Sequence, residues 1–159
     1  MAGLGLLLAA VVSGSANAKV QTEDWGRGRW GEPAKLITLE SSNLRVQLTN
    51  YGACIGSVDA PDKDGKRADV VLGYSDLQGY VNDPKDYFSA IVRRYGNRIA
   101  KGTFSIINQT YHIPPNNNGN ALHSGPEGFS TKMWTVTTKM DSALFTLVSP
   151  DGIWGFRVR

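Results

Sequence analysis

The sequence has little of what most metal, redox and nucleic-acid sites need: its 159 residues include one cysteine, two histidines and 19% charged residues. The single cysteine, Cys54, excludes an intrachain disulfide, and its apolar neighbours indicate a buried, unreactive thiol. Two isolated histidines without a neighbouring cysteine or carboxylate pair give no metal-ligand spacing. The net charge is +3 and the 17 basic residues are scattered. We therefore expect no metal site and no binding to nucleic acid or an anionic membrane.

Helical periodicity is also missing, because no apolar run after residue 18 has the spacing and length of an ordinary helix. Glycine is abundant instead, with 18 residues, as is typical of a chain with many turns. Leu44, Val46 and Leu48 alternate with polar residues, which predicts a strand buried on one face. The predicted fold class is all-β, sandwich-like or barrel-like, in one domain.

Further strands are expected at short apolar runs bounded by turn residues. These runs are residues 52–60, 70–72, 103–107, 110–113, 134–138 and 144–149. Residues 61–66 form a polar turn with an Asp-Gly hairpin signal. The stretch Ser75-Asp76-Leu77-Gln78 has capping-box spacing, which predicts one helical turn that Gly79 ends. Residues 19–34 are polar and rich in glycine and tryptophan, and we expect a lead-in segment there.

The N-terminus carries an apolar run at residues 3–12, followed by the small-residue triplet Ala16-Asn17-Ala18. This order predicts a signal peptide, residues 1–18, cleaved after Ala18, and the run is too short to span a bilayer. Because no Lys or Arg precedes the run, a disordered apolar N-terminus of a cytoplasmic protein is the alternative. The sequon Asn108-Gln109-Thr110 predicts N-glycosylation of Asn108 and agrees with a secreted protein that has no membrane association in its mature form.

Residues 114–129 match neither a helix nor a strand, because three prolines remove backbone donors and the glycines and asparagines favour turns. Long loops of this kind are often functional. Their one unusual side chain is His123, for which a structural imidazole bound by the loop backbone is the alternative. We expect His112 to be a surface or edge residue, and Trp134 and Phe129 to pack in the core rather than stack on a ligand.

A second polar segment, residues 93–98, contains three arginines and Asn97. If this segment is a strand, Arg94 and Arg98 share one face, with Gly96 between them leaving room for a ligand. Arginine and asparagine offer the planar, multi-donor groups that sugar hydroxyls need. A solvated basic turn is the alternative. The favoured hypothesis is that the two polar segments form a sugar-binding pocket on a β scaffold.

Five blocks occur in order within residues 36–152. They are Asn50-Tyr51-Gly52-Ala53, Pro61-Asp62-Lys63-Asp64-Gly65, Asp69-Val70-Val71-Leu72-Gly73-Tyr74, Tyr95-Gly96-Asn97-Arg98-Ile99-Ala100 and Asn117-Asn118-Gly119-Asn120-Ala121-Leu122-His123-Ser124-Gly125. Together they resemble the aldose 1-epimerase (galactose mutarotase) family. The resemblance implies a galactose-mutarotase-like β-supersandwich, of which residues 35–159 are the N-terminal part. It also implies interconversion of the α and β anomers of a hexose, galactose or glucose, by acid–base ring opening without a cofactor.

The resemblance assigns three residues to the substrate. By the family's motif, Asn97 and Arg98 contact sugar hydroxyls, and His123 matches the first active-site histidine, which binds and polarises the substrate. Two positions depart from the pattern, since Arg93 and Ser124 stand where the family usually has glycine. The family's second histidine (the general acid), an aspartate and the glutamate base lie beyond the last matched block, so no catalytic residue is assigned.

Two functional hypotheses follow. The first is the N-terminal part of a secreted aldose 1-epimerase, incomplete at the C-terminus and weakly active or inactive as this chain. The second is a non-catalytic carbohydrate-binding β-sandwich or a truncated splice product, with open sheet edges that favour partner binding or aggregation. Glu127 lies near His123 in the sequence, and we do not favour it as the missing base. The oligomeric state is not predicted.

Overall fold

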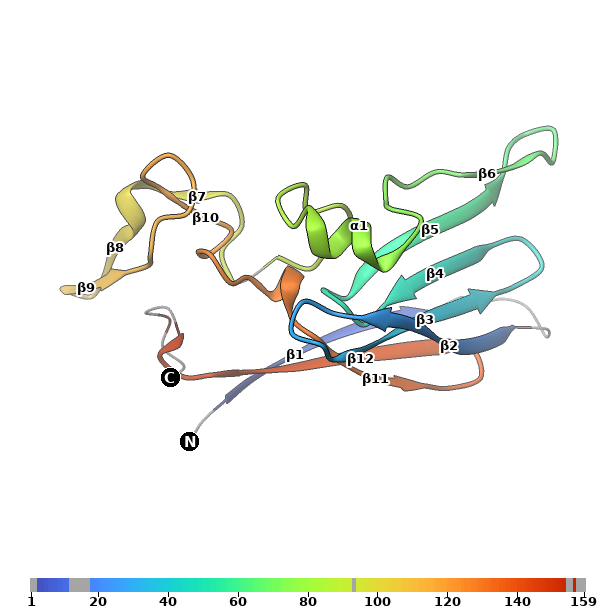
Figure 1. The fold of residues 1–159 in the computed structure, drawn as a ribbon, viewed down its shortest axis with the longest axis horizontal. Coiled ribbons are helices and arrows are strands. Elements are labelled where there is room, and N and C mark those ends of the chain that lie inside the picture. Colours follow the sequence, from blue (N-terminus) through green and yellow to red (C-terminus); the bar gives the residue numbers. More distant parts are fainter. Residues whose placement is uncertain (1–2, 12–17, 93, 154–155, 157–159) are drawn as a thin grey trace.

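Two antiparallel β-sheets pack against each other in the computed structural model, which describes residues 3–11, 18–92, 94–153 and 156 (Figure 1). The larger sheet has the order β2 (Lys19–Arg27), β3 (Pro33–Glu40), β4 (Arg45–Thr49), β5 (Cys54–Pro61) and β6 (Arg67–Asp69). The smaller sheet has the order β1 (Gly3–Val11), β12 (Ser142–Pro150) and β11 (Thr135–Thr138). The predicted all-β sandwich is confirmed.

The main core lies between these two sheets. Ile37 and Leu39 of β3 share one buried cluster with Phe145 of β12. Trp134 and Phe129 belong to the same cluster, and their rings meet edge to face with centroids 6.1 Å apart. The indole N–H of Trp134 donates to the carbonyl of Phe129 at 3.1 Å, so the buried polar atom has its partner. Both aromatic residues are core residues, as the sequence predicts.

A second apolar cluster lies beneath α1 (Leu77–Asn82), on the outer side of the larger sheet. Its fully buried residues are Ala34, Tyr51, Cys54, Leu77 and Tyr80. Burial raises the pKa of the Cys54 thiol to about 12, which confirms an inert buried cysteine. The helix N-cap is Asp76, whose carboxylate accepts the Gly79 N–H at 2.9 Å. Gly79 therefore lies inside the helix, and the prediction that it ends the helical turn is wrong.

Two other local predictions are also wrong. Residues 19–34 are not a lead-in segment, since they contain β2 and its turn into β3. The edge strand β2 exposes most of its side chains, so no apolar alternation marks it in the sequence. The buried strand expected at residues 70–72 is absent, because β6 ends at Asp69 and the side chains of Val70 and Leu72 are 67% and 74% exposed.

Most of the N-terminal apolar segment forms β1, which runs antiparallel to β12 from Gly3 opposite Pro150 to Val11 opposite Ser142. Residues 12–17, which include most of the cleavage triplet, lie outside the described residues. Cleavage after Ala18 therefore stays a prediction. No helix in the described part of the chain is both long enough and apolar enough to cross a membrane.

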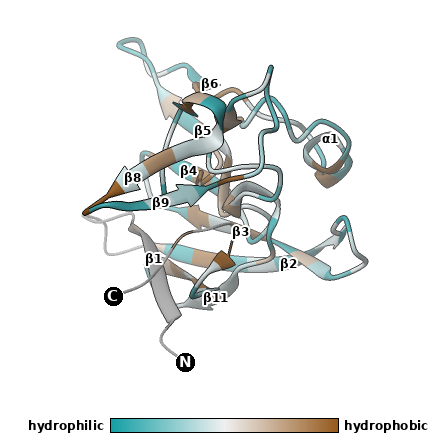
Figure 2. Ribbon diagram, turned by 90° about the vertical axis from the view of Figure 1, so that its left-hand side faces the viewer, coloured by the Kyte–Doolittle hydropathy of each residue, from teal (hydrophilic) through white to brown (hydrophobic). Residues whose placement is uncertain are grey.

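A smaller lobe extends from one end of the sandwich (Figure 1). It contains β7 (Arg98–Ile99), the 3-10 turn η1 (Ala100–Gly102), β8 (Thr103–Ile106), β9 (Gln109–His112) and β10 (Ala121–Leu122), and the 3-10 turn η2 (Phe129–Thr131) leads back to the sandwich. The strands expected at residues 103–107 and 110–113 are present as the β8–β9 hairpin, with its turn at residues 107–108, and Figure 2 shows the hairpin projecting from the body. Its two turn residues, Ile107 and Asn108, both have positive φ, as a tight primed hairpin turn requires. Asn108 is exposed at this tip and His112 is exposed on β9, as expected of a surface residue.

Candidate functional site

The two polar segments lie side by side because β7 pairs with β10. Arg98 stands opposite Leu122 and Ile99 opposite Ala121 in this antiparallel pair. The pairing places Asn97 and His123, which flank the two short strands, next to each other. The structure thus brings together all three residues that the motif assigns to the substrate.

Asn97 and His123 are joined by two hydrogen bonds in opposite directions. The backbone N–H of His123 donates to the carbonyl of Asn97 at 2.9 Å. The backbone N–H of Asn97 donates to Nδ1 of the His123 imidazole at 3.1 Å. Nδ1 must offer a lone pair to accept this bond, so the neutral ring carries its proton on Nε2. The pairing therefore leaves Nε2–H as the imidazole group that can donate to a ligand.

Electrostatics favour this neutral ring. Partial burial lowers the pKa of His123 below its ordinary value of 6.5, and the positive charge of Arg98 lowers it further. The backbone N–H that points at Nδ1 also disfavours a second proton at that atom. At neutral pH the ring is thus a hydrogen-bond donor rather than a cation.

Arg98 is fixed by two asparagine side chains. Its Nε donates to Oδ1 of Asn117 at 3.0 Å, and one terminal nitrogen donates to Oδ1 of Asn97 at 3.1 Å. A guanidinium has five N–H donors, so further donors stay available for sugar hydroxyls. Asn117 comes from the loop, which means that Arg98 ties the loop to Asn97 while keeping its own binding capacity.

Arg94 does not join this site. One of its terminal nitrogens donates to Oγ of Ser149 in β12 at 2.9 Å, and its guanidinium carbon lies 5.7 Å from the ring centroid of Phe156. The prediction that Arg94 and Arg98 share one strand face is wrong. Only Arg98 enters a strand, and the left-handed backbone of Asn97 (φ 63°) breaks the alternation between them. Arg93 lies outside the described residues.

The side chain of Ser124 connects the loop to the backbone of Tyr95. Its side chain is fully buried, and its hydroxyl accepts the Tyr95 N–H at 3.0 Å and donates to the Tyr95 carbonyl at 3.1 Å. His123 and Ser124 both have left-handed backbones, with φ of 49° and 67°. Such conformations are unfavourable for non-glycine residues and persist where surrounding contacts enforce them. The departure from the family's glycine thus supplies a second link between the loop and residues 94–98.

A cavity of about 450 Å³ adjoins the site through Asn117, which accepts from Arg98, and Leu122, which precedes His123, while Asn97, Arg98 and His123 are not among its lining residues. Lys85 and Tyr87, residues 116–118 and residues 130–131 contribute to its lining. Tyr87 also contacts the imidazole of His123, with ring centroids 4.5 Å apart. The volume is within the roughly 300–1,000 Å³ of small-molecule sites. The described lining residues include no carboxylate.

Glu127, which the sequence places near His123, forms an ion pair with Lys132 at 3.0 Å. No group of three His, Cys, Asp or Glu side chains among the described residues is arranged to hold a metal ion. Sequence reasoning missed Tyr87, because nothing in its neighbourhood forms a recognisable ligand pattern.

Two packed sheets with a polar cavity at the adjoining lobe define a β-sandwich protein with a candidate small-molecule site. The aldose 1-epimerase family model matches residues 35–159, and the chain belongs to this family. It is 39% identical over 126 residues to galactose mutarotase from Rattus norvegicus, covering 79% of this chain and 36% of that protein. It is 34% identical over 128 residues to aldose 1-epimerase from Escherichia coli K12, covering 79% and 37%. The chain thus spans roughly a third of the length of these curated relatives.

Solved structures agree on the fold. Galactose 1-epimerase from Lactobacillus acidophilus NCFM aligns with a TM-score of 0.74 at 23% identity, covering 89% of this chain and 42% of that one. An aldose epimerase homologue from C. elegans aligns with a TM-score of 0.57 at 32% identity, covering 61% and 30%. The first likeness shows the fold alone, because its sequence identity is low.

The two hydrogen bonds of Ser124 give a stability prediction. Ser124→Ala leaves both backbone groups of Tyr95 without this partner, and we expect a loss of about 1–3 kcal/mol in the free energy of unfolding. Ser124→Gly loses the same bonds but relieves the left-handed backbone, which offsets about 1 kcal/mol. The free energy of unfolding measured in urea should therefore be highest for the wild type, lower for Ser124→Gly and lowest for Ser124→Ala. An alanine variant as stable as the wild type would contradict this role.

The lowered pKa of His123 predicts a pH dependence. Between 6.5 and the lowered value, the unfolded chain binds more protons than the folded one, so the free energy of unfolding falls as the pH falls. Urea unfolding at about pH 7.5 and about pH 5.5 measures this loss. His123→Asn, whose side-chain oxygen can still accept the Asn97 N–H, should lose less stability than the wild type. A loss in His123→Asn as large as in the wild type would exclude His123 as its source, and His112→Asn is the matched control for the removal of one histidine.

Proposed function

We propose that this chain binds a hexose, galactose or glucose, in the cavity beside His123. The observation that carries the proposal is the reciprocal pairing of Asn97 with His123, which holds a neutral imidazole next to the cavity-lining residues Leu122 and Tyr87. Nε2–H of His123 and the remaining N–H groups of Arg98 are donors, and the amides of Asn97 and Asn117 add polar groups. A mixed, mostly uncharged polar surface suits a neutral polyhydroxylated ligand.

Family membership supports a reaction as well as binding. We propose that the chain is part of an aldose 1-epimerase that interconverts the α and β anomers of its hexose. In this reaction a base removes the proton of the anomeric hydroxyl while an acid protonates the ring oxygen, and the opened aldehyde turns before it recloses. His123 would donate its Nε2–H to a sugar oxygen and polarise it. The bond between C1 and the ring oxygen breaks and re-forms with no change of oxidation state, and only protons are exchanged with the protein, so the reaction needs no cofactor.

We propose that this chain alone has little or no catalytic activity. Both an acid and a base must lie within hydrogen-bond reach of the sugar. The described cavity lining offers no carboxylate base, and Glu127 is paired with Lys132. The same observation favours the second candidate function, a non-catalytic carbohydrate-binding domain, and the two functions differ in turnover rather than in binding.

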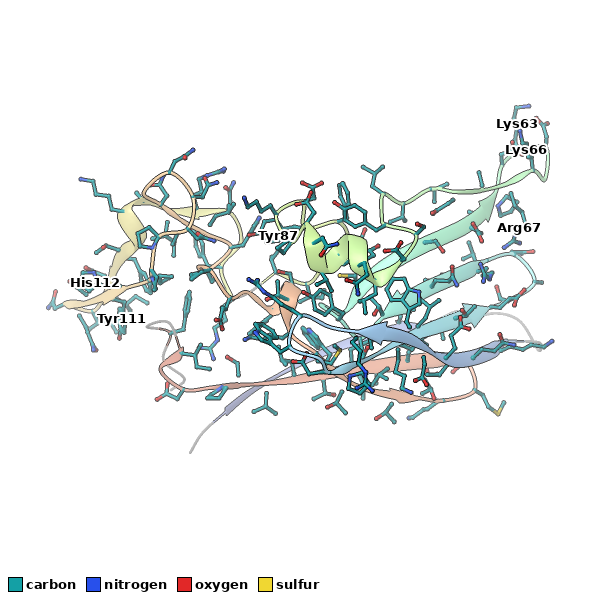
Figure 3. The ribbon with its side chains drawn as sticks, viewed as in Figure 1. Lys63, Lys66, Arg67, Tyr87, Tyr111 and His112 are labelled. Atoms are coloured by element: carbon teal, nitrogen blue, oxygen red, sulfur yellow. The ribbon has the colours of Figure 1, made fainter. Side chains whose placement is uncertain are left out.

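Binding of galactose tests the proposed site. Titration calorimetry with the 159-residue chain should detect binding of galactose. The substitution Arg98→Ala should weaken the affinity for galactose by at least about tenfold, because charge-assisted hydrogen bonds contribute about 1.5–3 kcal/mol each. Arg67→Ala is the matched control, since Figure 3 shows Arg67 far from the lobe that carries the site. Equal affinities of wild type and Arg98→Ala, or no binding by soluble wild type, would contradict the proposal.

Polarimetry then separates the two functions. Mutarotation of α-galactose in the presence of the chain should proceed at, or only slightly above, the rate in buffer alone. A large acceleration would show that the chain supplies both an acid and a base, which contradicts the proposed lack of activity.

A further inference from the structure

Tyr87 is the aromatic residue that joins the imidazole of His123 to the cavity. The two rings meet edge to face, with centroids 4.5 Å apart and planes at 64°. At this separation and tilt, aromatic rings attract each other beyond simple area burial. Tyr87 also lines the cavity, and Figure 3 shows it on the segment that follows α1. A third segment, outside β7 and the loop, therefore reaches the site.

The backbone that carries Tyr87 is strained and firmly attached. Tyr87 and Ser89 have left-handed backbones, with φ of 52° and 49°, which bulky residues rarely adopt. The carbonyl of Ser89 accepts the Ile55 N–H at 3.3 Å, and the Ile91 N–H donates to the carbonyl of Gly52 at 3.0 Å. These bonds connect the strained segment to the larger sheet at β5 and the turn before it. Strain that is enforced in this way is common where a side chain must be held for a ligand.

The contact between the Tyr87 and His123 rings adds a constraint that the Asn97 hydrogen bonds do not provide. Those bonds fix which nitrogen of His123 accepts, but a hydrogen bond to one ring atom leaves the plane of the imidazole free to tilt. The Tyr87 ring restricts this tilt. Partial burial raises the pKa of the Tyr87 phenol, so the side chain stays neutral and adds no charge beside the imidazole. The positive charge of Arg98, on β7, lowers the pKa of the His123 imidazole.

We propose that Tyr87 is a positioning residue for sugar recognition. Its ring holds the His123 imidazole in the one orientation that accepts the Asn97 N–H at Nδ1 and leaves Nε2–H for a sugar oxygen. The proposal rests on the hexose binding proposed above and adds a residue that lies outside the five motif blocks. The ring of Tyr87, rather than its hydroxyl, contacts the imidazole, so we expect Tyr87→Phe to preserve the positioning of His123.

The experiment compares Tyr87→Leu with the conservative Tyr87→Phe in the full 159-residue chain. Nitrogen-15 spectra of the histidine rings report the tautomer and the protonation midpoint, and the chain has only two histidines. In the wild type and in Tyr87→Phe, His123 should be the Nε2–H tautomer. In Tyr87→Leu the ring signals should show mixed tautomers and a midpoint closer to 6.5, and the galactose affinity should fall about three- to tenfold. Tyr111→Leu, which removes a ring from the distant β8–β9 hairpin, is the matched control and should change neither readout.

Two results would overturn the proposal. The first is an unchanged tautomer and midpoint of His123 in folded Tyr87→Leu, and the second is a Tyr87→Phe variant that behaves like Tyr87→Leu. If Tyr87→Leu does not fold, nuclear Overhauser contacts between the Tyr87 and His123 ring protons of the wild type decide instead, and their absence overturns the proposal.

The same data separate this inference from the hexose proposal. If the wild type gives no response to galactose while Tyr87→Leu still changes the His123 ring signals, Tyr87 positions the histidine and the hexose proposal fails. If galactose binds and loses affinity in Arg98→Ala but not in Tyr87→Leu, hexose binding stands and the positioning role of Tyr87 fails.

Discussion

The two hydrogen bonds between Asn97 and His123 are the constraint on which the site depends. They join residues that lie far apart in the sequence, and they do so at the point where β7 meets β10. Because one bond runs from each backbone N–H, neither residue can shift without breaking its partner's contact. The neighbouring contacts support this pair: Arg98 donates to the side chain of Asn97, Ser124 bonds the backbone of Tyr95, and Tyr87 packs against the imidazole of His123.

The physical consequence is a histidine held neutral and in one tautomer. Burial and the Arg98 charge lower its pKa, and the Asn97 N–H occupies the one nitrogen that a second proton would need. Because the donor is already fixed, its side chain loses little conformational entropy when a sugar binds. The strained backbones of His123, Ser124 and Tyr87 are consistent with this function, since each is unfavourable by itself and is held by neighbouring hydrogen bonds.

Much of the architecture could be predicted from the sequence. The alternation of Leu44, Val46 and Leu48 marks β4, and the prolines and asparagines of residues 114–129 mark the loop, although they do not predict the two-residue strand β10 within it. The ordered motif blocks, rather than any single residue, selected the family and grouped Asn97, Arg98 and His123. Predictions failed where exposure contradicted hydrophobicity: β2 is a polar edge strand, while residues 70–72 are apolar and exposed.

The contacts within the site could not be predicted in the same way. Arg94 and Arg98 look equivalent in the sequence, but the left-handed backbone of Asn97 lies between them. Arg94 donates to Ser149, whereas Arg98 stays at the site and donates to Asn117. Tyr87 carries no motif, because its role comes from a ring contact across sequence-distant segments. Positive φ at a non-glycine residue leaves no reliable mark in composition or periodicity, so the backbone geometry that shapes the site appears only in three dimensions.

The most direct test is the scalar coupling between the backbone nitrogen of Asn97 and Nδ1 of His123 in the nitrogen-15-labelled chain. Such a coupling is transmitted through an N–H···N hydrogen bond and identifies both atoms. The reciprocal pairing predicts a measurable coupling at neutral pH that disappears when His123 is protonated. A folded chain with no such coupling at neutral pH, or with its His123 proton on Nδ1, would contradict the pairing and with it the candidate site.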